Sequence, residues 1–277
     1  MRTLVHLSDL HFGRVDEQLI APLISAVTEI NPDLVAVSGD LTQRARSQQF
    51  REARAFLDAL PQPQIVVPGN HDVPLHNVFT RFMQPLDKYK RYITDNLRPV
   101  YLDDEIVVVG VNTARSLTIK GGRINANQVA HIREMLCASG DKLVKTVVTH
   151  HPFDLPEGYK DRDLVGRSQM AMTGLADCGA DLFLAGHLHI SHTGHTAKRY
   201  NIHGHSALVV QAGTASSTRG RGEANSFNVI RINRPDMTVE RLTWQPESSA
   251  FVISSEERFR HTSDGWVRLS EGSHGRV

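Results

Sequence analysis

The chain has 277 residues, a formal net charge of +1 and a pI near 7.9. This length is sufficient for one large α/β domain or two small ones, and the near-neutral charge excludes the basic field on which nucleic-acid binding relies. No apolar stretch approaches the length that spans a bilayer, and the first residues contain no signal-like apolar region. The two cysteines, Cys137 and Cys178, fit a reducing compartment and exclude a disulfide framework, although a single bridge stays open. A cytoplasmic protein is therefore expected.

Short apolar runs alternate with helical patterns through the first two thirds of the chain. The runs are typical of buried strands in a parallel sheet, and a β-α-β-α-β order implies right-handed crossovers between parallel neighbours. Pro22 implies a kink or a start within the first helix, and Ser47 is the expected N-cap of the second. The predicted strands are residues 3–7, 34–37, 65–67, 106–111, 143–149 and 181–185, and the helical patterns cover 19–30, 47–60, 129–136 and 168–178.

The pattern changes in the last third of the chain. Strand-like runs at 207–211, 227–232, 237–244, 251–258 and 265–269 are separated by turns and contain no long helix between them. We expect a single domain over 1–277, with βα units in 1–190 and mostly antiparallel strands in 200–270. Specificity is expected from two segments beside the rigid part, the polar stretch 76–98 (helical or lid-like) and the loop 213–226.

Polar side chains follow five of the predicted strands. In open α/β folds, sites form outside the carboxyl ends of parallel strands, so these side chains are expected to meet. Each group alone is a weak signal, since an isolated polar turn after a strand is common. Their recurrence at successive strand ends makes chance a poor explanation. The groups are Asp9-x-His11, Gly39-Asp40, Gly69-Asn70-His71-Asp72, His150 and Gly186-His187-x-His189.

The chemistry of these residues predicts a metal centre. Imidazole and carboxylate together, without thiolate, suit manganese, iron, cobalt or zinc better than calcium or magnesium. Seven ligands exceed what one four-coordinate ion requires. They are appropriate for two ions, about 3.5–4 Å apart, that share a bridging carboxylate and a bridging water. Such a pair lowers the pKa of the water and holds the oxygens of a phosphoryl group.

These blocks resemble the signature of the calcineurin-like metallophosphoesterase superfamily: D-x-H, G-D, G-N-H-[DE], H and G-H-x-H, in that order over residues 9 to 189. The resemblance implies a mixed β-sandwich flanked by α-helices, a four-layer α-β-β-α fold. It implies one metal held by Asp9, His11, Asp40 and His189, and another held by Asp40, Asn70, His150 and His187, with Asp40 bridging.

The resemblance also assigns roles around the metals. His71, together with Asn70, faces the substrate, and His71 protonates or stabilises the leaving oxygen. Asp72 is expected to be structural and to orient His71. His151 is an alternative to His150 as the ligand, although the H-x-P pattern favours His150. The Asp-Arg-Gly continuation of the protein Ser/Thr phosphatases is absent after Asp40, which argues against that subgroup.

The chain most resembles the bacterial class III cyclic-nucleotide phosphodiesterases in its length, its Gly-Asp-Leu-Thr block and its Gly-Asn-His-Asp block. The leading hypothesis is hydrolysis of a small phosphodiester, such as a cyclic nucleotide, by a metal-bridging hydroxide with His71 as general acid. The alternatives are a phosphomonoesterase, a diesterase acting on nucleic acid or phospholipid, and a non-catalytic scaffold that binds metal. No nucleic-acid or membrane partner is indicated, and the sequence leaves a homo-oligomer open.

Other polar residues lie near the predicted edge. Arginine suits phosphate bidentately, but for each arginine a solvated surface position is the favoured interpretation. The histidines near the motifs are interpreted as loop residues, with His192 and His195 the strongest exceptions. The candidates are Arg14, Arg44, Arg46, Asn112, Arg219, Arg221, His76, His192, His195, His203 and His205.

Overall fold

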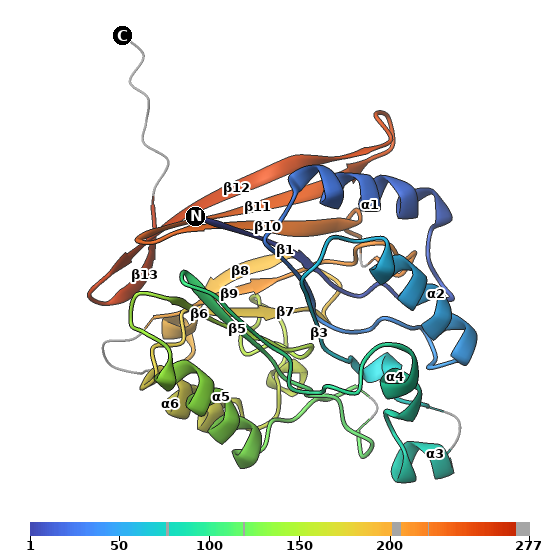
Figure 1. The fold of residues 1–277 in the computed structure, drawn as a ribbon, viewed down its shortest axis with the longest axis horizontal. Helices are drawn as coiled ribbons and strands as arrows, with labels where there is room; N and C mark the ends of the chain where they lie inside the picture. The colour runs from blue at the N-terminus through green and yellow to red at the C-terminus, as the bar shows by residue number, and fades with distance from the viewer. Residues whose placement is uncertain (76–77, 119, 201–205, 221, 270–277) are drawn as a thin grey trace.

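Two mixed β-sheets pack face to face in the computed structural model, which describes residues 1–75, 78–118, 120–200, 206–220 and 222–269 (Figure 1). The first sheet has the order β13 (Gly265–Arg268), β12 (Ala250–Thr262), β11 (Asp236–Gln245), β10 (Ser226–Asn233), β1 (Arg2–Leu7), β2 (Leu34–Val37) and β3 (Gln64–Val66). The second has the order β4 (Val100–Leu102), β5 (Ile106–Gly110), β6 (Val144–Val148), β7 (Leu182–Ala185), β9 (Leu208–Gln211) and β8 (His192–His195).

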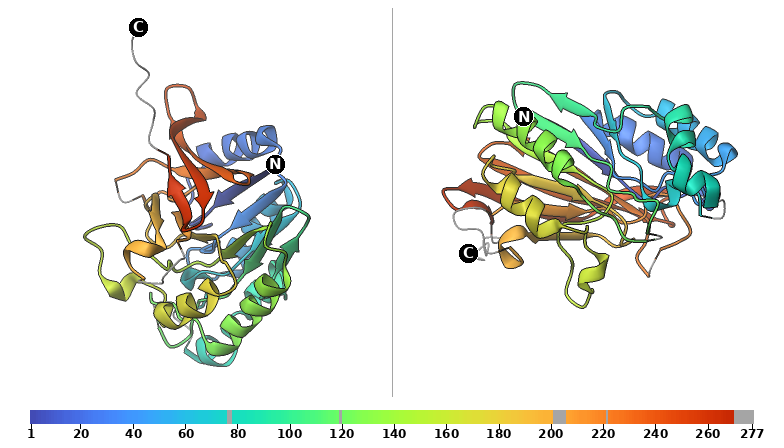
Figure 2. Two further views of the ribbon diagram at one scale, coloured as in Figure 1. Left: turned by 90° about the vertical axis from the view of Figure 1, so that its left-hand side faces the viewer. Right: turned by 90° about the horizontal axis from the view of Figure 1, so that it is seen from below.

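Helices cover the outer face of each sheet (Figure 2). α1 (Glu17–Ile30) and α2 (Ser47–Asp58) lie on the first sheet, and α5 (Ala126–Ala138) and α6 (Ser168–Ala176) lie on the second. The segment between β3 and β4 contains two short helices, α3 (Val78–Met83) and α4 (Asp87–Tyr92), so the helical prediction for this segment is confirmed. The predicted four-layer α-β-β-α arrangement is therefore correct.

Alternating side chains explain why the strands are apolar on both faces. In β5, Ile106 and Val108 point into the core between the sheets, whereas Val107 and Val109 pack under α5 and α6. In β1, Leu4 lies between the sheets and its neighbour Val5 faces the helices on the other side. A strand buried on both faces favours apolar residues at successive positions, which is why these segments are rich in Val, Ile and Leu.

The C-terminal strands differ from the sequence-based prediction in one respect. β10 pairs with β1 in antiparallel register, so β10–β13 extend the first sheet directly. β9, however, pairs in parallel with β7 and belongs to the second sheet. The region 200–270 is therefore divided between the two sheets. The short edge strands β4 and β8 were not predicted.

Two predicted helix starts are also corrected. Asp16 is the N-cap of α1, because its side chain accepts a hydrogen bond from the N–H of Gln18, and Pro22 lies inside the helix rather than at its start. Arg46, not Ser47, is the N-cap of α2. Asn125 and Gln128 form a reciprocal capping box at the start of α5.

Cys137, in the last turn of α5, forms a disulfide with Cys178, just after α6, with 4.7 Å between their Cα atoms. This is the single bridge that the sequence left open. It lies on the outer face of the second sheet. Among the described residues, no helix has both the length and the apolar character that crossing a membrane would require.

Candidate dinuclear metal centre

The seven predicted ligand residues converge at the carboxyl ends of five parallel strands. Each group lies within four residues of the end of its strand, and Asn70 and His71 lie in a short 3₁₀ helix, Asn70–Asp72, after β3. The strands that deliver them are neighbours within the two sheets, which brings residues distant in the sequence together. Asp9 and His11 follow β1, Asp40 follows β2, Asn70 follows β3, His150 follows β6, and His187 and His189 follow β7.

The first half of the centre contains Asp9, His11, Asp40 and His189. Potential ligand atoms of these four residues all lie within 4.8 Å of one another, and all four side chains are buried. Both ring nitrogens of His11 and Oδ1 of Asp9 have no hydrogen-bond partner. Buried polar groups are normally paired, so these atoms call for a partner that the described protein does not supply. A metal ion fits this requirement.

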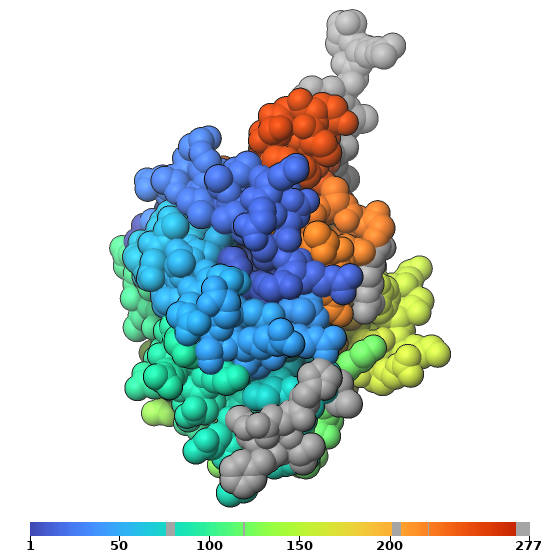
Figure 3. Space-filling view, turned by 90° about the vertical axis from the view of Figure 1, so that its right-hand side faces the viewer, coloured from blue at the N-terminus to red at the C-terminus, as the bar shows by residue number. Residues whose placement is uncertain are grey.

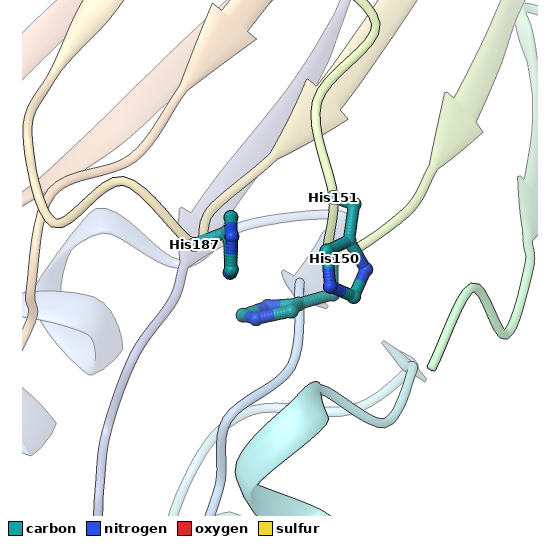
Figure 4. A group of neighbouring side chains, drawn as sticks. All are labelled: His150, His151 and His187. Atoms are coloured by element: carbon teal, nitrogen blue, oxygen red, sulfur yellow. The ribbon is translucent and has the colours of Figure 1, made fainter. Parts of the chain in front are cut away.

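The second half contains Asn70, His150 and His187. Oδ1 of Asn70 lies 3.1 Å from Nε2 of His150 and 3.0 Å from Nδ1 of His187. Nδ1 of His150 donates to the backbone carbonyl of Ser38 at 2.8 Å, which fixes the ring so that Nε2 faces the site. Figure 4 shows His150, His151 and His187 grouped where β6 and β7 end.

Asp40 joins the two halves. Its Oδ2 lies 3.7 Å from Nε2 of His11, and its Oδ1 lies 3.4 Å from Nε2 of His150. Oδ1 also accepts a hydrogen bond from the N–H of His71 at 2.8 Å. The two oxygens of one carboxylate thus face different groups of candidate ligands. This arrangement suits a carboxylate that bridges two metal ions.

Several of these residues adopt a left-handed backbone conformation that non-glycine residues rarely use. The φ angles are 53° at Asp9, 51° at His11, 53° at Asp40, 74° at His187 and 59° at His189. Such conformations cost roughly 1–3 kcal/mol each and persist where the surrounding structure enforces them. Their concentration at one edge of the sheets supports a functional role for this edge.

The glycines of the signature blocks permit close approach of the chain segments. A methyl group at Gly69 would overlap Oδ1 and the backbone N of Asp40, and one at Gly186 would overlap Oγ of Ser8 and Oδ2 of Asp9. Neither position has room for a Cβ atom. The glycines therefore allow the carboxylates to lie directly against the neighbouring strand ends.

The electrostatics of the site favour bound cations. Although burial disfavours the charged form, the surrounding histidines hold the pKa values of Asp9 and Asp40 below their usual range. Burial lowers the pKa of His187 to about 3 and that of His189 to about 4, which leaves both imidazoles neutral. Burial opposes the charged form of His150 too, but the adjacent Asp40 carboxylate raises its pKa to about 9. Metal ligation by His150 would release this proton.

His151 is held differently from His150. Its Nδ1 lies 2.9 Å from Oγ1 of Thr113, and its Nε2 donates to the backbone carbonyl of Lys120 at 2.9 Å. With both nitrogens occupied, His151 supports the loop that follows β5. These contacts favour His150 as the metal ligand.

Asp72 and His71 show how the G-N-H-D block is built. The Asp72 carboxylate accepts hydrogen bonds from the backbone N–H groups of Leu41, Thr42 and Gly69, so it holds the loops together. The sequence had suggested that Asp72 orients His71, but these hydrogen bonds go to backbone N–H groups instead. Nδ1 of His71 donates to the carbonyl of Gln43 at 2.9 Å, so Nε2 is the ring nitrogen left for other partners. Burial lowers the pKa of His71.

Two contacts at the site involve residues that sequence reasoning missed or undervalued. Thr214 lies 2.9 Å from Nδ1 of His189, and Nη1 of Arg219 donates to Nε2 of His71 at 2.9 Å. Both lie in the loop 213–226, and Arg219 was also among the arginine candidates for phosphate, although a surface position was the favoured interpretation. The remaining candidates are dispersed. The side chain of Asn112 accepts a hydrogen bond from the N–H of Ala114, and the three arginines Arg14, Arg44 and Arg46 are exposed. His192 and His195 lie on β8, and the candidates outside the described residues are His76, His203, His205 and Arg221.

Comparison with known proteins agrees with this geometry. The chain is 30% identical over 171 residues to the glycerophosphodiester phosphodiesterase GpdQ of Enterobacter lignolyticus, covering 58% of this chain and 60% of that protein. It is 24% identical over 188 residues to the probable glycerophosphodiester phosphodiesterase GpdQ of Arcobacter nitrofigilis, covering 60% of this chain and 64% of the relative. The chain thus spans somewhat less than two thirds of the length of these curated relatives.

Solved structures share the fold at low sequence identity. A dimetal phosphatase from Danio rerio superposes with a TM-score of 0.62 at 14% identity, covering 91% of this chain and 98% of that one. The purple acid phosphatase PPD1 of Lupinus luteus gives 0.67 at 10% identity, covering 93% of this chain and 53% of the other. The family described as calcineurin-like phosphoesterase matches residues 2–191, a range that includes all seven candidate ligands. The chain therefore belongs to the calcineurin-like phosphoesterase family.

Proposed function

We propose that this protein is a dinuclear-metal phosphodiesterase. The observation that carries the proposal is the placement of Asp40, whose two carboxylate oxygens face His11 on one side and His150 on the other. The metals would be held by Asp9, His11, Asp40 and His189 in one half and by Asp40, Asn70, His150 and His187 in the other. Manganese, iron, zinc and cobalt all suit this donor set.

When bound, two such ions supply Lewis-acid stabilisation of the phosphoryl oxygens and lower the pKa of the attacking water. The protein residues supply orientation and a proton. His71 would donate to the leaving oxygen from Nε2 in its imidazolium form, because the proton on Nδ1 is donated to the carbonyl of Gln43. The N–H of His71 also bonds Asp40, so the ring is positioned relative to the shared carboxylate.

A small phosphodiester is the substrate class that the relatives support. Both curated relatives are described as glycerophosphodiester phosphodiesterases, whereas the sequence blocks resemble cyclic-nucleotide phosphodiesterases. The two substrates share a phosphodiester monoanion and differ in the leaving group. We therefore assign the reaction class to the site and leave the leaving group to be determined by experiment.

A substrate panel tests this proposal. Protein reconstituted with Mn²⁺ is assayed on 3′,5′- and 2′,3′-cyclic nucleotides, a glycerophosphodiester, bis-p-nitrophenyl phosphate, a phosphomonoester and single-stranded DNA. We expect turnover of at least one small diester and its loss in His71→Ala and Asn70→Ala. Preference for the monoester would indicate a phosphomonoesterase. Two bound metals with no turnover of any ester would indicate a non-catalytic scaffold.

The neighbouring histidines provide a matched pair for the ligand assignment. We expect His150→Ala to retain about one metal ion per chain and His151→Ala to retain two, measured by elemental analysis after gel filtration. The contacts of His151 with Thr113 and Lys120 predict that its loss destabilises the protein by about 1–3 kcal/mol without removing metal. The reverse metal contents would exchange the roles of the two residues.

We also infer a single domain over residues 1–277 and a cytoplasmic location. The domain assignment is supported by the pairing of β10 with β1, which links the C-terminal strands to the first strand of the chain. The location rests on the sequence. Because disulfides are rare in reducing compartments, the Cys137–Cys178 bridge makes fractionation under thiol-blocking conditions the appropriate test.

A further inference from the structure

The segment 213–219, which follows β9, lies outside the range matched by the family and yet borders the candidate site. It runs along the loop that carries Asp9 and His11 (Figure 3, orange beside blue). The N–H of Ala215 donates to the carbonyl of Ser8 at 3.1 Å, and the N–H of Thr218 donates to the carbonyl of Arg14 at 3.1 Å. The segment is thus anchored to the site along its length.

This anchoring places Arg219 beside the general acid proposed above. Nη1 of Arg219 donates to Nε2 of His71 at 2.9 Å, and Nδ1 of His71 is engaged by Gln43. In the structure, therefore, the nitrogen that must face the leaving oxygen is occupied by a guanidinium. Burial lowers the pKa values of His71 and His189, and the positive charge of Arg219 contributes to both shifts, which places that charge close to both rings.

A phosphodiester would offer Arg219 a better partner than the imidazole does. The imidazole presents one uncharged lone pair, whereas a phosphodiester presents two oxygens that share a negative charge. Hydrogen bonds from guanidinium to phosphate are charge-assisted and are often bidentate. An oxygen that approaches Nε2 of His71 must also come close to Nη1 of Arg219, because the two nitrogens are only 2.9 Å apart.

We propose that Arg219 is a substrate-binding residue, which takes a non-bridging oxygen of the phosphodiester and in doing so frees Nε2 of His71. The freed nitrogen takes up a proton from solvent, and the resulting imidazolium donates it to the leaving oxygen. The inference rests on the proposed function and adds a residue to it from outside the family-matched range. The loop 213–226, in which Arg219 lies, would then contribute directly to recognition of the phosphoryl group. Thr214, in the same segment, would position the His189 ring through Nδ1.

The test compares Arg219→Ala and Arg219→Lys with Arg258→Ala as a control for the loss of one positive charge. Arg258 lies on β12, has a side chain that is 68% exposed and pairs with Glu256. All proteins are loaded with Mn²⁺ and checked for metal content and thermal unfolding. The first measurement is binding of inorganic phosphate by calorimetry. The second is kcat/KM on bis-p-nitrophenyl phosphate, with and without added guanidinium at millimolar concentration.

We expect Arg219→Ala to weaken phosphate binding by about 10- to 100-fold, because one charge-assisted contact is lost, and Arg219→Lys to fall between this variant and wild type. Added guanidinium should restore part of the activity of Arg219→Ala and none of that of His71→Ala. Arg258→Ala should remain within about twofold of wild type. A purely structural role for Arg219 would show neither the phosphate effect nor the chemical rescue.

Two outcomes separate this inference from the proposed function. Phosphate affinity and kcat/KM of Arg219→Ala within twofold of the wild-type values would overturn the inference while the diesterase stands. Absence of diester turnover in wild type, combined with phosphate binding that depends on Arg219, would overturn the proposed function and support the role of Arg219 in binding the anion.

Discussion

Buried aspartates are used in two different ways at the carboxyl ends of the parallel strands and at the amino end of β7. At the carboxyl end of β2, Asp40 lies among side chains with left-handed backbones and unpartnered atoms, such as both nitrogens of His11. At the amino end, Asp181 accepts hydrogen bonds from the N–H of Lys145 at 2.9 Å and from Nε1 of Trp266 at 2.8 Å. The first arrangement leaves buried polar atoms in a cluster that suits a cation, whereas Asp181 is paired within the protein.

This difference suggests that function and stability are concentrated at opposite ends of the same strands. The amino end also has Arg234 and His261, each 3.6 Å from an oxygen of Asp181, and the Cys137–Cys178 disulfide lies nearby, lining the same surface cavity. Natural proteins often place strained or unsatisfied groups where chemistry occurs and compensate elsewhere in the fold. Substitutions at the two ends should therefore have opposite signatures.

Asp40→Asn should give the largest effect. The substitution removes the charge shared by both halves of the centre, so we expect kcat/KM on a small diester to fall by at least ~100-fold and metal content to drop. The unfolding free energy of the metal-free protein should change by no more than about 1–2 kcal/mol, since Asn retains an acceptor for the N–H of His71. Normal metal content with undiminished turnover would refute the bridging role.

The disulfide should show the reverse behaviour. Its loop closes over a sequence separation of 41 residues, so replacing both cysteines by serine should lower the unfolding free energy by about 4 kcal/mol. Urea unfolding measures this loss. The kcat/KM of the folded variant should equal that of wild type, because α5 and α6 lie on the outer face of the second sheet. A large change in kcat/KM with unchanged stability would contradict the division between the two ends.

Asp181→Asn is the matched partner of Asp40→Asn at the amino end of β7. Asn can accept the hydrogen bond of Lys145 or of Trp266, but its amide N–H₂ would then face donors rather than acceptors. We expect a loss of about 3 kcal/mol in unfolding free energy, with metal content and kcat/KM unchanged. The result would be informative only if both aspartate variants are compared in the same buffer, with and without Mn²⁺. Loss of activity in the folded Asp181→Asn protein would show that the two ends are coupled.

The candidate site residues could be identified from the sequence because carboxylate, amide and imidazole ligands are recognisable side chains and their order follows the strands. Asp9, Asp40 and His150 stand directly after apolar runs, and parallel strands bring such positions to one edge. The parts that could not be predicted depend on tertiary contacts. The carbonyls that orient His71 and His150 belong to Gln43 and Ser38. Every residue has a backbone carbonyl, so the sequence does not show which one a histidine ring will contact.

The same reason explains the errors elsewhere in the fold. The apolar run that forms β9 resembles its neighbours 227–232 and 237–244, and only the packing of the second sheet pairs it in parallel with β7. Arg219 and Thr214 could be placed in a specificity loop, but their contacts depend on where that loop docks against residues 8–16. Local patterns therefore predicted the elements and the candidate ligands, whereas long-range pairing determines which residues surround them.

His6 provides the smallest and most specific test, because it lies near the carboxyl end of β1 but outside the ligand set. Its ring is completely buried, with Nε2 2.9 Å from Oγ of Ser38, and burial lowers its pKa from 6.5 to about 3. The unfolded chain therefore binds a proton at His6 as the pH falls below 6.5, whereas the folded protein binds it only as the pH approaches about 3. Its contribution to stability is complete above pH 6.5 and is lost as the pH falls from 6.5 towards 3, at a limiting slope of about 1.4 kcal/mol per pH unit.

His6→Gln keeps a polar group near Ser38 but does not titrate. We expect its unfolding free energy to decline less steeply than that of wild type between pH 6 and pH 4, and to run parallel to wild type between pH 7 and pH 8. Urea unfolding of the metal-free proteins across this range measures both slopes. Equal slopes below pH 6 would mean that His6 accepts a proton in the folded state. In that case, the carboxyl end of β1 would be more open to water than its complete burial indicates.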